Sequence, residues 1–337
     1  MYILPPCILL TLVVVLPVCL AGDKCGRKTS TKDAATGSPD ESPTEALGSP
    51  NARPTPTSRT AQSTSPLPTG GGGGKVTLDS TFIYELDNTP VDSPTISSSS
   101  GVKVDGSVYI VDMEHSTPEQ ITKYKADGKT VICYFSAGTW EPGRGDASSF
   151  EGSCVCKGGK LGSSSCSSSD NKMSDWNEWW LDIHSDECKA SVQNVMAARI
   201  KSAKAKGCDG VDPDNVDSYI NTDEQKHGNT EQDQVDYLTF LSTTARENGL
   251  LIDLKNGGDL LKGEHKDAIV AAFDFSVIEQ CHKYDECDVY KPMLAAGKPN
   301  FQIEYGGMSS CPSLSKGQHL LVYSQDTLDT RKITLAC

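Results

Sequence analysis

The sequence GCDGVDPDNVD at residues 207–217 decides the fold assignment, because a short apolar segment leads into four carboxylates within nine residues. A long segment with helical spacing precedes it, so the pattern is typical of a buried strand that opens into an acidic loop. Pro213 cannot donate a hydrogen bond to a sheet ladder, which favours a strand end here. The alternatives are a solvated acidic turn or a calcium loop, but the D-x-D-x-D-G spacing of a calcium loop is missing.

Outward from this stretch, apolar β-branched segments alternate with helix-patterned segments over residues 76–337. Such alternation indicates βα units and a parallel sheet, and the length suits one (β/α)8 barrel. We therefore predict an α/β fold, a single TIM-type (β/α)8 barrel domain. Its eight strands are expected at residues 81–86, 108–113, 130–136, 207–214, 250–255, 273–279, 300–305 and 318–323.

Helix signals lie between these strands. Thr117, Pro118 and Gln120 form a capping-box start with proline at the first helical position, and Gly128 ends that helix. Apolar residues repeat at helical spacing over 192–203, where only the stem of Arg199 needs to lie against apolar surface, and again over 230–248. Two irregular regions, 87–106 and 148–171, follow the first and third strands and leave the face where barrels of this type build active sites.

The N-terminal part differs in composition. Residues 1–21 are almost wholly apolar and end in a small-residue cleavage pattern, which predicts a secretory signal peptide, with an uncleaved membrane anchor as the alternative. Residues 22–75 are rich in Ser, Thr, Pro and Gly and predict a disordered, O-glycosylated stalk. The expected location is therefore extracellular, and the catalytic-sized domain spans residues 76–337.

The chain has thirteen cysteines, and removing Cys7 and Cys19 with the signal leaves eleven, an odd number for an oxidising compartment. We expect Cys281–Cys287 and Cys311–Cys337 bridges, and we expect Cys133 and Cys208 to be buried unpaired thiols. A zinc site at 154–166 has little support, because its cysteines lack a CxxC spacing. The net charge of −14 disfavours nucleic acid and anionic membranes and favours a cationic substrate.

Several chemistries lack their motifs. The chain has no G-x-S-x-G elbow and no H-E-x-x-H, and Lys123 stands where the first glycine of a P-loop would be. The six histidines show no ligand spacing. We therefore expect no metal, no cofactor and no nucleophilic serine.

What remains is a set of carboxylates at predicted strand ends: Asp112, Asp212, Asp214, Glu279 and Glu304. In a parallel barrel all of these reach one face and converge on one cleft. Polar and aromatic residues accompany them, and crowding raises the pKa of at least one acid, as a general acid requires. Paired acids with aromatics suit glycosidic-bond cleavage. The accompanying residues are Tyr134, Ser136, Trp140, Glu141, Arg144, Lys255, Asn256 and Tyr305.

Six runs also carry a resemblance to a known family: VICYFSAG (131–138), WLDI (180–183), KGCDGVDPDN (206–215), LKN (254–256), EQC (279–281) and IEY (303–305). In collinear order over residues 108–305, they resemble fungal members of glycoside hydrolase family 114, endo-α-1,4-polygalactosaminidases with a (β/α)8 barrel. The resemblance implies hydrolysis of internal α-1,4-galactosamine linkages in galactosaminogalactan of fungal walls and biofilms. It places the catalytic acids at Asp214 and Glu279, without a cofactor.

From this we expect Asp214 as nucleophile and Glu279 as acid/base in a retaining mechanism, for which carboxyls ~5–5.5 Å apart are required. Asp214 is preferred to Asp212 because bacterial relatives are acidic only at the Asp214 position. The protein is expected to be a monomer that binds a cationic polysaccharide. The residues assigned to substrate binding are Asp112, Tyr134, Ser136, Trp140, Arg144, Asp212, Lys255, Asn256, Glu304 and Tyr305. The family's first-strand tryptophan and D-x-D-x-F-D run are changed here to Phe82-Ile83-Tyr84 and IVDMEH, which leaves the subsite contacts open.

Alternatives remain at several positions. Asp112 and Glu304 could instead be structural partners of Arg144 or Lys255, and Lys255 could anchor the acids or touch substrate. Asp209 and Asp217 are interpreted as cap or surface residues, and Trp179 and Trp180 as packing residues. At the level of function, the alternatives are a carbohydrate-binding wall protein without turnover and an α-galactosidase-like enzyme on neutral polymer.

Overall fold

The computed structural model describes residues 74–87, 95–162, 166 and 169–337. The predicted signal peptide and nearly all of the predicted stalk, residues 1–73, lie outside them. None of the helices in the described ranges combines the length and the apolar character needed to cross a membrane.

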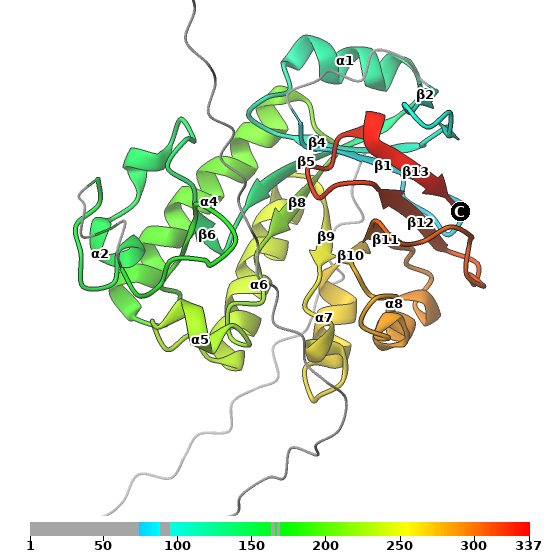
Figure 1. The fold of residues 1–337 in the computed structure, drawn as a ribbon. Helices are drawn as coiled ribbons and strands as arrows, with labels where there is room; N and C mark the ends of the chain where they lie inside the picture. The colour runs from blue at the N-terminus through cyan, green and yellow to red at the C-terminus, as the bar shows by residue number, and fades with distance from the viewer. Residues whose placement is uncertain (1–73, 88–94, 163–165, 167–168) are drawn as a thin grey trace, which may run out of the picture. The chain divides into compact units, whose positions relative to one another are not determined.

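All eight predicted strands form, and each lies parallel to its neighbour in one curled sheet (Figure 1). The β-branched and aromatic residues of these segments are buried on both faces, as expected for a parallel sheet covered by helices. The barrel prediction is confirmed. In sheet order the parallel strands are β1 (Phe82–Glu85), β4 (Val108–Asp112), β5 (Thr130–Ser136), β8 (Gly210–Asp214), β9 (Leu251–Lys255), β10 (Phe275–Glu279), β11 (Asn300–Tyr305) and β12 (Gln318–Tyr323).

A ninth strand, which the sequence did not predict, ends the sheet. Strand β13 (Ile333–Ala336) pairs antiparallel with β12. No ladder among the described residues joins β1 to β12 or β13, so hydrogen bonds bridge this seam instead. The Tyr323 hydroxyl donates to the carbonyl of Tyr84 at 2.7 Å, and the Leu86 amide donates to the carbonyl of Leu328 at 3.1 Å.

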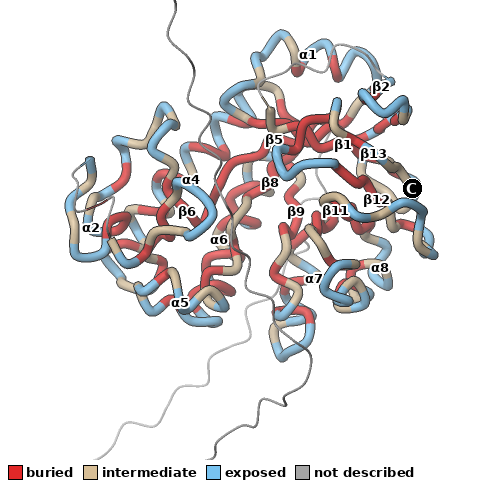
Figure 2. Tube along the Cα trace, in the orientation of Figure 1, coloured by how far each residue is buried: buried red, intermediate tan, exposed pale blue. Residues whose placement is uncertain are grey.

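Helices form over all three segments that show helical signals in the sequence, and two of these helices start with a capping box. Helix α1 starts with a complete capping box between Thr117 and Gln120, and α6 starts with another between Thr230 and Asp233. Both pack their apolar side on the sheet, so burial follows the strands and the inner helix faces (Figure 2). The α-helices are α1 (Pro118–Ala126), α2 (Gly152–Val155), α4 (Asp186–Lys206), α5 (Thr222–Gln225), α6 (Glu231–Glu247), α7 (Lys266–Ala272) and α8 (Lys291–Ala295).

Arg199 of α4 is buried as a whole, not only along its stem. Its guanidinium donates to the Ser136 carbonyl at 2.6 Å and to both carboxylate oxygens of Asp146 at 2.7 Å. The helix therefore carries a paired charge into the core, where the bidentate geometry satisfies it.

The two irregular regions contain short elements. A hairpin of β2 (Ile96–Ser97) and β3 (Lys103–Val104) lies in the first, while β6 (Thr139–Trp140) and β7 (Trp179–Trp180) flank the second. The 3₁₀ turns are η1 (Ala147–Ser149), η2 (Gly258–Leu261), η3 (Cys287–Tyr290) and η4 (Thr330–Lys332). Trp179 and Trp180 are buried, as predicted for packing residues.

Five disulfides join the ten described cysteines. The Cys281–Cys287 and Cys311–Cys337 predictions are confirmed, and Cys154–Cys188 and Cys156–Cys166 tie the second irregular region together. The prediction that Cys133 and Cys208 are unpaired thiols is wrong. Because β5 and β8 are sheet neighbours, the Cα atoms of these two residues lie 6.0 Å apart and their sulfurs form a bond.

Candidate active site

Three adjacent strands end in the central residues of the candidate site. Asp214 ends β8, Lys255 ends β9 and Glu279 ends β10. The Lys255 ammonium donates to Asp214 Oδ1 at 2.9 Å and to Glu279 Oε2 at 2.5 Å. Lys255 is only 1% exposed, so these carboxylates are its main partners. Of its two predicted roles, the structure favours the anchor between the acids.

Each of these strands turns sharply at its next residue. Asn215, Asn256 and Gln280 have φ values of 61°, 50° and 57°. Non-glycine residues seldom occupy this left-handed region, and asparagine tolerates it better than most. The three turns end the strands directly after Asp214, Lys255 and Glu279, and the Glu279 side chain lines the cleft described below.

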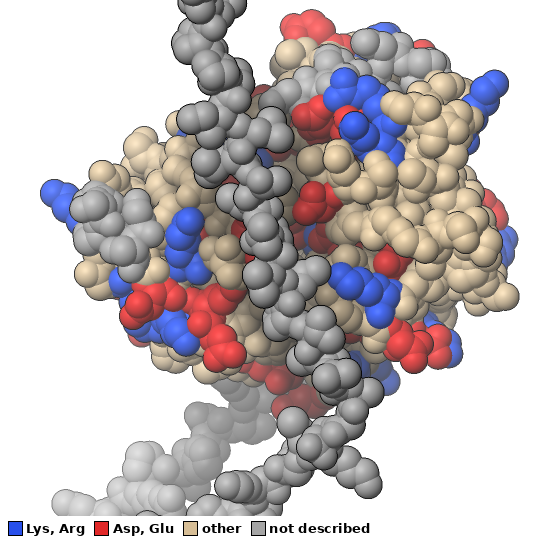
Figure 3. All heavy atoms as spheres, in the orientation of Figure 1, with Lys and Arg blue, Asp and Glu red and all other residues tan. Residues whose placement is uncertain are grey.

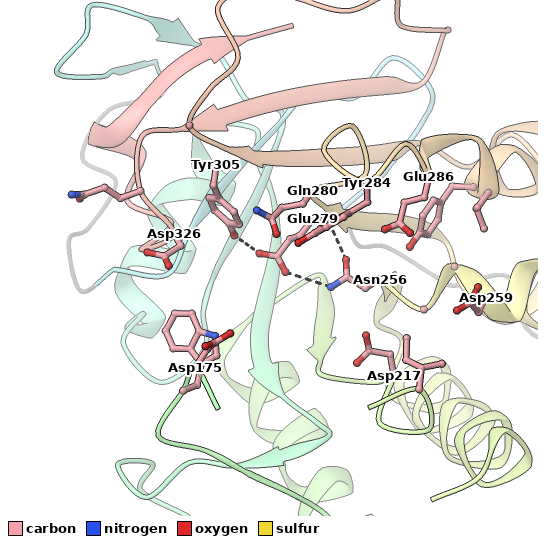
Figure 4. A pocket seen from close by; sticks show the side chains of 18 of the residues that line it. Asp175, Asp217, Asn256, Asp259, Glu279, Gln280, Tyr284, Glu286, Tyr305 and Asp326 are labelled. Atoms are coloured by element: carbon pink, nitrogen blue, oxygen red, sulfur yellow. Dashed lines mark hydrogen bonds between the residues drawn. The ribbon is translucent and has the colours of Figure 1, made fainter. Parts of the chain in front are cut away.

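Further hydrogen bonds orient the two carboxylates. The Tyr134 hydroxyl donates to Asp214 Oδ2 at 3.1 Å, and the Tyr305 hydroxyl donates to Glu279 Oε1. The Asn256 amide donates to Glu279 Oε2 at 3.4 Å, and its carbonyl oxygen accepts the Glu279 amide at 2.9 Å (Figure 4). Four predicted site residues therefore contact the predicted catalytic pair directly, counting Lys255 among them.

Charge and burial shift the pKa values of Glu279 and Lys255 in opposite directions. Burial by itself would raise the pKa of Glu279, but the Lys255 ammonium and three hydrogen bonds lower that pKa below its ordinary value. Burial opposes the charge of Lys255 as well, yet Asp214, Glu279 and Asp212 raise the pKa of Lys255 well above its usual range. In the free protein the centre is thus a buried ammonium in ion-pair contact with the carboxylates of Asp214 and Glu279.

Crowding does raise the pKa of other acids, as the sequence suggested. Burial and the charge of Asp214 raise the pKa of Asp217 to about 6. Burial raises the pKa of Asp212 to about 6 as well, against the influence of Lys255. Both acids stem from the run at residues 207–217, but only Asp217 reaches the cleft.

A cleft of about 1140 Å³ opens above Glu279. Its walls carry five further carboxylates, and Lys262 is the one basic side chain among its described lining residues, paired with Asp259 at 2.6 Å. Figure 3 shows acidic side chains toward the middle of the face seen there, with Lys and Arg scattered around them. The five wall carboxylates are Asp175, Asp217, Asp259, Glu286 and Asp326, which Figure 4 places around Glu279.

Large apolar side chains also line the cleft. Trp176 is 51% exposed, Tyr284 is 60% exposed and Ile220 is 49% exposed, and they are the exposed large hydrophobic residues of the described chain. The Lys283 ammonium lies 4.9 Å from the centroid of the Tyr284 ring, so this ring face already accepts a cation. Exposed aromatics grouped in one cleft are typical of a ligand-binding surface.

Other predicted substrate contacts lie away from the cleft lining. Asp112 is buried and bound by Arg144 at 2.7 Å, which matches the structural alternative for that pair. Trp140 is buried and donates to the Ala147 carbonyl at 2.9 Å. The remaining three, Ser136, Asp212 and Glu304, are buried too, and Glu304 accepts the His282 amide at 2.7 Å.

Sequence reasoning missed most of the cleft walls. Asp217 was interpreted as a cap or surface residue, but it is half-buried and lines the cleft. Asp209, interpreted in the same way, is buried and bound by Lys125 at 2.8 Å. The wall residues lie in loops without periodicity. A tryptophan flanked by Asp175 and Asn177 was the one local signal, because an exposed-looking loop seldom carries so large an apolar side chain.

Two groups of side chains in the described part have metal-ligand geometry, and neither fits an ion. Cys281 and Cys287 beside His282 are joined in a disulfide. Of Glu85, Asp87 and Asp329, the last two already bind Arg331 at 2.7 and 2.8 Å. The carboxylate chemistry of the cleft needs neither group.

Comparison with known proteins agrees with this geometry. The model of glycoside-hydrolase family GH114 matches residues 57–330. The crystal structure of Aspergillus fumigatus Ega3 in complex with galactosamine is 27% identical, covering 79% of this chain and 99% of that chain at a TM-score of 0.58. The glycoside hydrolase domain of PelA from Pseudomonas aeruginosa is 16% identical, covering 74% and 96% at a TM-score of 0.47. Among curated protein sequences there is no significant match.

Proposed function

The chain belongs to glycoside hydrolase family 114, and on that premise we propose that it is a secreted endo-glycosidase that cleaves internal α-1,4-galactosamine linkages. The observation that carries the proposal is the Asp214–Lys255–Glu279 bridge, whose Glu279 lines an acidic cleft. Two carboxylates at the ends of β8 and β10, on either side of the strand that carries Lys255, supply the two groups that glycosidic cleavage needs.

In the proposed mechanism Asp214 attacks the anomeric carbon and Glu279 protonates the leaving oxygen. Water then hydrolyses the glycosyl-enzyme while Glu279 takes its proton. The two hydrogen bonds from Lys255 support retention. Because Nζ lies 2.9 Å from Asp214 Oδ1 and 2.5 Å from Glu279 Oε2, these two oxygens are at most 5.4 Å apart. Inverting enzymes place their carboxyl groups ~6.5–9.5 Å apart.

Glu279 must gain a proton to act as the acid. In the free protein its pKa is lowered by Lys255, so the carboxyl is ionised at neutral pH. A sugar on the cleft floor removes the water that screens Glu279 from the negative charge of Asp214. The loss of this water raises the pKa of Glu279 by desolvation, and the less screened charge of Asp214 raises that pKa as well.

The charge of the cleft supports a cationic substrate. Galactosamine with a free amine is an ammonium ion near neutral pH, and five wall carboxylates face the path of the polymer. The Ega3 structure contains galactosamine, a sugar of this kind. The cleft volume of about 1140 Å³ exceeds the needs of a single sugar and suits binding within a chain. Five disulfides and the apolar N-terminal segment support secretion.

A digestion panel tests this function. Deacetylated galactosamine polymer should release reducing ends, whereas the fully acetylated polymer and a neutral galactan should release far fewer. KM for the deacetylated polymer should rise with ionic strength, because salt screens the attraction between the ammonium groups and the cleft. Salt-insensitive cleavage of neutral galactan would support an α-galactosidase-like enzyme. Binding of polymer without any product would support a carbohydrate-binding protein.

Removing the aromatic rings should weaken binding without stopping turnover. Trp176→Ala and Tyr284→Ala should each raise KM for long polymer about two- to five-fold, since a cation on an exposed ring contributes about 0.5–1 kcal/mol. Trp176→Phe and Tyr284→Phe keep a ring and should stay near wild type. Ile220→Ala, an exposed cleft residue without a ring, is the matched control. Equal losses in Ile220→Ala and the two alanine variants would rule out a ring-specific contribution.

A further inference from the structure

A second pair of acids lies one layer below the catalytic centre. Asp212 and Asp214 are two residues apart on β8, and Asp253 and Lys255 are two residues apart on β9. Residues so spaced point to the same face of a sheet, here the barrel interior. Asp212 and Asp253 therefore form a lower layer beneath Asp214 and Lys255. Both are fully buried.

The lower pair has too few hydrogen-bond donors for two ionised acids. Both oxygens of Asp253, and Oδ1 of Asp212, receive no hydrogen bond from any described N–H or O–H group. Asp212 Oδ2 accepts the Tyr84 hydroxyl at 2.6 Å. Gly210 pairs with Leu251 and Val211 with Ile252 in the parallel register of β8 and β9, so Asp212 and Asp253, the next residues of the two strands, lie side by side. A proton between them is the group that can satisfy both, because a bare buried carboxylate pair is strongly disfavoured.

The surrounding charges favour the same arrangement. Facing Asp253 are Asp212 and Asp214 from β8 and Lys255 from its own strand; Glu279 on β10 and Tyr84 on β1 complete this interior. With every acid ionised, one ammonium would face four carboxylates in the barrel. One proton on the lower pair reduces the number of ionised carboxylates to three. Two of these, Asp214 and Glu279, bind Lys255 directly.

We propose that Asp253 is a protonated positioning residue that donates its hydrogen bond to an ionised Asp212, and that Asp212 in turn holds Lys255 from below. The pair then carries one negative charge, and Lys255 stays centred between the two catalytic carboxylates. The catalytic consequence rests on the proposed function, but the protonation itself does not. Burial, followed by the charge of Asp212, raises the pKa of Asp253 well above its ordinary value, in agreement with the neutral form.

A pair of isosteric substitutions, Asp253→Asn and Asp212→Asn, tests which of the two acids holds the proton. The amide keeps the shape and the donor of the neutral acid but cannot ionise, so kcat/KM should stay within about three-fold of wild type. Asp212→Asn removes the charge beneath Lys255 and should lower kcat/KM at least about ten-fold. If the roles of the two acids were reversed, Asp212→Asn would be the mild variant and Asp253→Asn the damaging one, which would overturn the proposal.

Stability as a function of pH gives a readout that needs no substrate. An acid whose folded pKa is raised binds its proton more tightly in the folded state, so stability falls as pH rises from the ordinary pKa of 3.8 toward the raised one. Asp253→Asn removes that loss. The Tm of Asp253→Asn minus the Tm of the wild type should therefore increase steadily between about pH 4 and pH 8. A constant difference across this range would overturn the proposal, even if the protein proved inactive on galactosamine polymers.

Discussion

Asp214→Asn and Glu279→Gln are each expected to lower kcat on deacetylated galactosamine polymer by about 10²–10⁴-fold while the protein stays folded. The first change removes the nucleophile and the second removes the proton donor, and both keep the shape of the side chain. Retained binding of polymer, together with a wild-type circular dichroism spectrum, would assign the loss to chemistry.

The leaving group distinguishes the two roles. An activated aryl glycoside of a galactosamine oligomer needs no proton on its leaving oxygen, so Glu279→Gln should still release the aryl group, whereas Asp214→Asn should not. Azide should restore turnover of Glu279→Gln by attacking the glycosyl-enzyme without a general base. Asp259→Asn is the matched control, because Asp259 lines the cleft away from the bridge and pairs with Lys262. A fully active Asp214→Asn would refute its role as nucleophile.

Lys255→Met is expected to destabilise the protein by about 3–5 kcal/mol and to abolish most turnover, because it leaves two facing carboxylates without their buried partner. Urea unfolding monitored by tryptophan fluorescence measures the stability. The matched control is Lys262→Met, which removes an exposed ion pair of 2.6 Å and should cost under about 1 kcal/mol. Equal effects of the two substitutions would contradict the anchoring role of Lys255.

The pH dependence of Lys255→Met follows from the lowered pKa of Glu279. In the wild type this lowered pKa contributes stability above the ordinary value of 4.5, and the contribution is lost as pH falls through the folded pKa. In Lys255→Met the pKa of Glu279 rises, because burial and Asp214 then act without the ammonium. Protonation relieves the repulsion, so the stability difference from wild type should narrow as pH falls from 7 toward 5.

Local patterns were enough to predict the strands and the capped helices. The capping boxes at Thr117 and Thr230 depend on residues three positions apart, and the eight strands show as short apolar segments between turn signals. Strand β13 was missed because it follows β12 closely and pairs antiparallel at the edge of the sheet, outside the βα alternation. The unpaired state predicted for Cys133 and Cys208 failed for a similar reason, since it depended on which strands become neighbours.

The sequence by itself determined that Asp214, Lys255 and Glu279 lie at the ends of parallel strands and so on one face of a barrel, because each position depends only on its own strand. Only the tertiary structure decided that Lys255 joins the two acids, that Asp253 lies beside Asp212, and that loop residues such as Asp175 and Asp326 form the cleft walls. These contacts join segments tens of residues apart. Their geometry depends on strand order, register and loop paths, which no local pattern of side chains encodes.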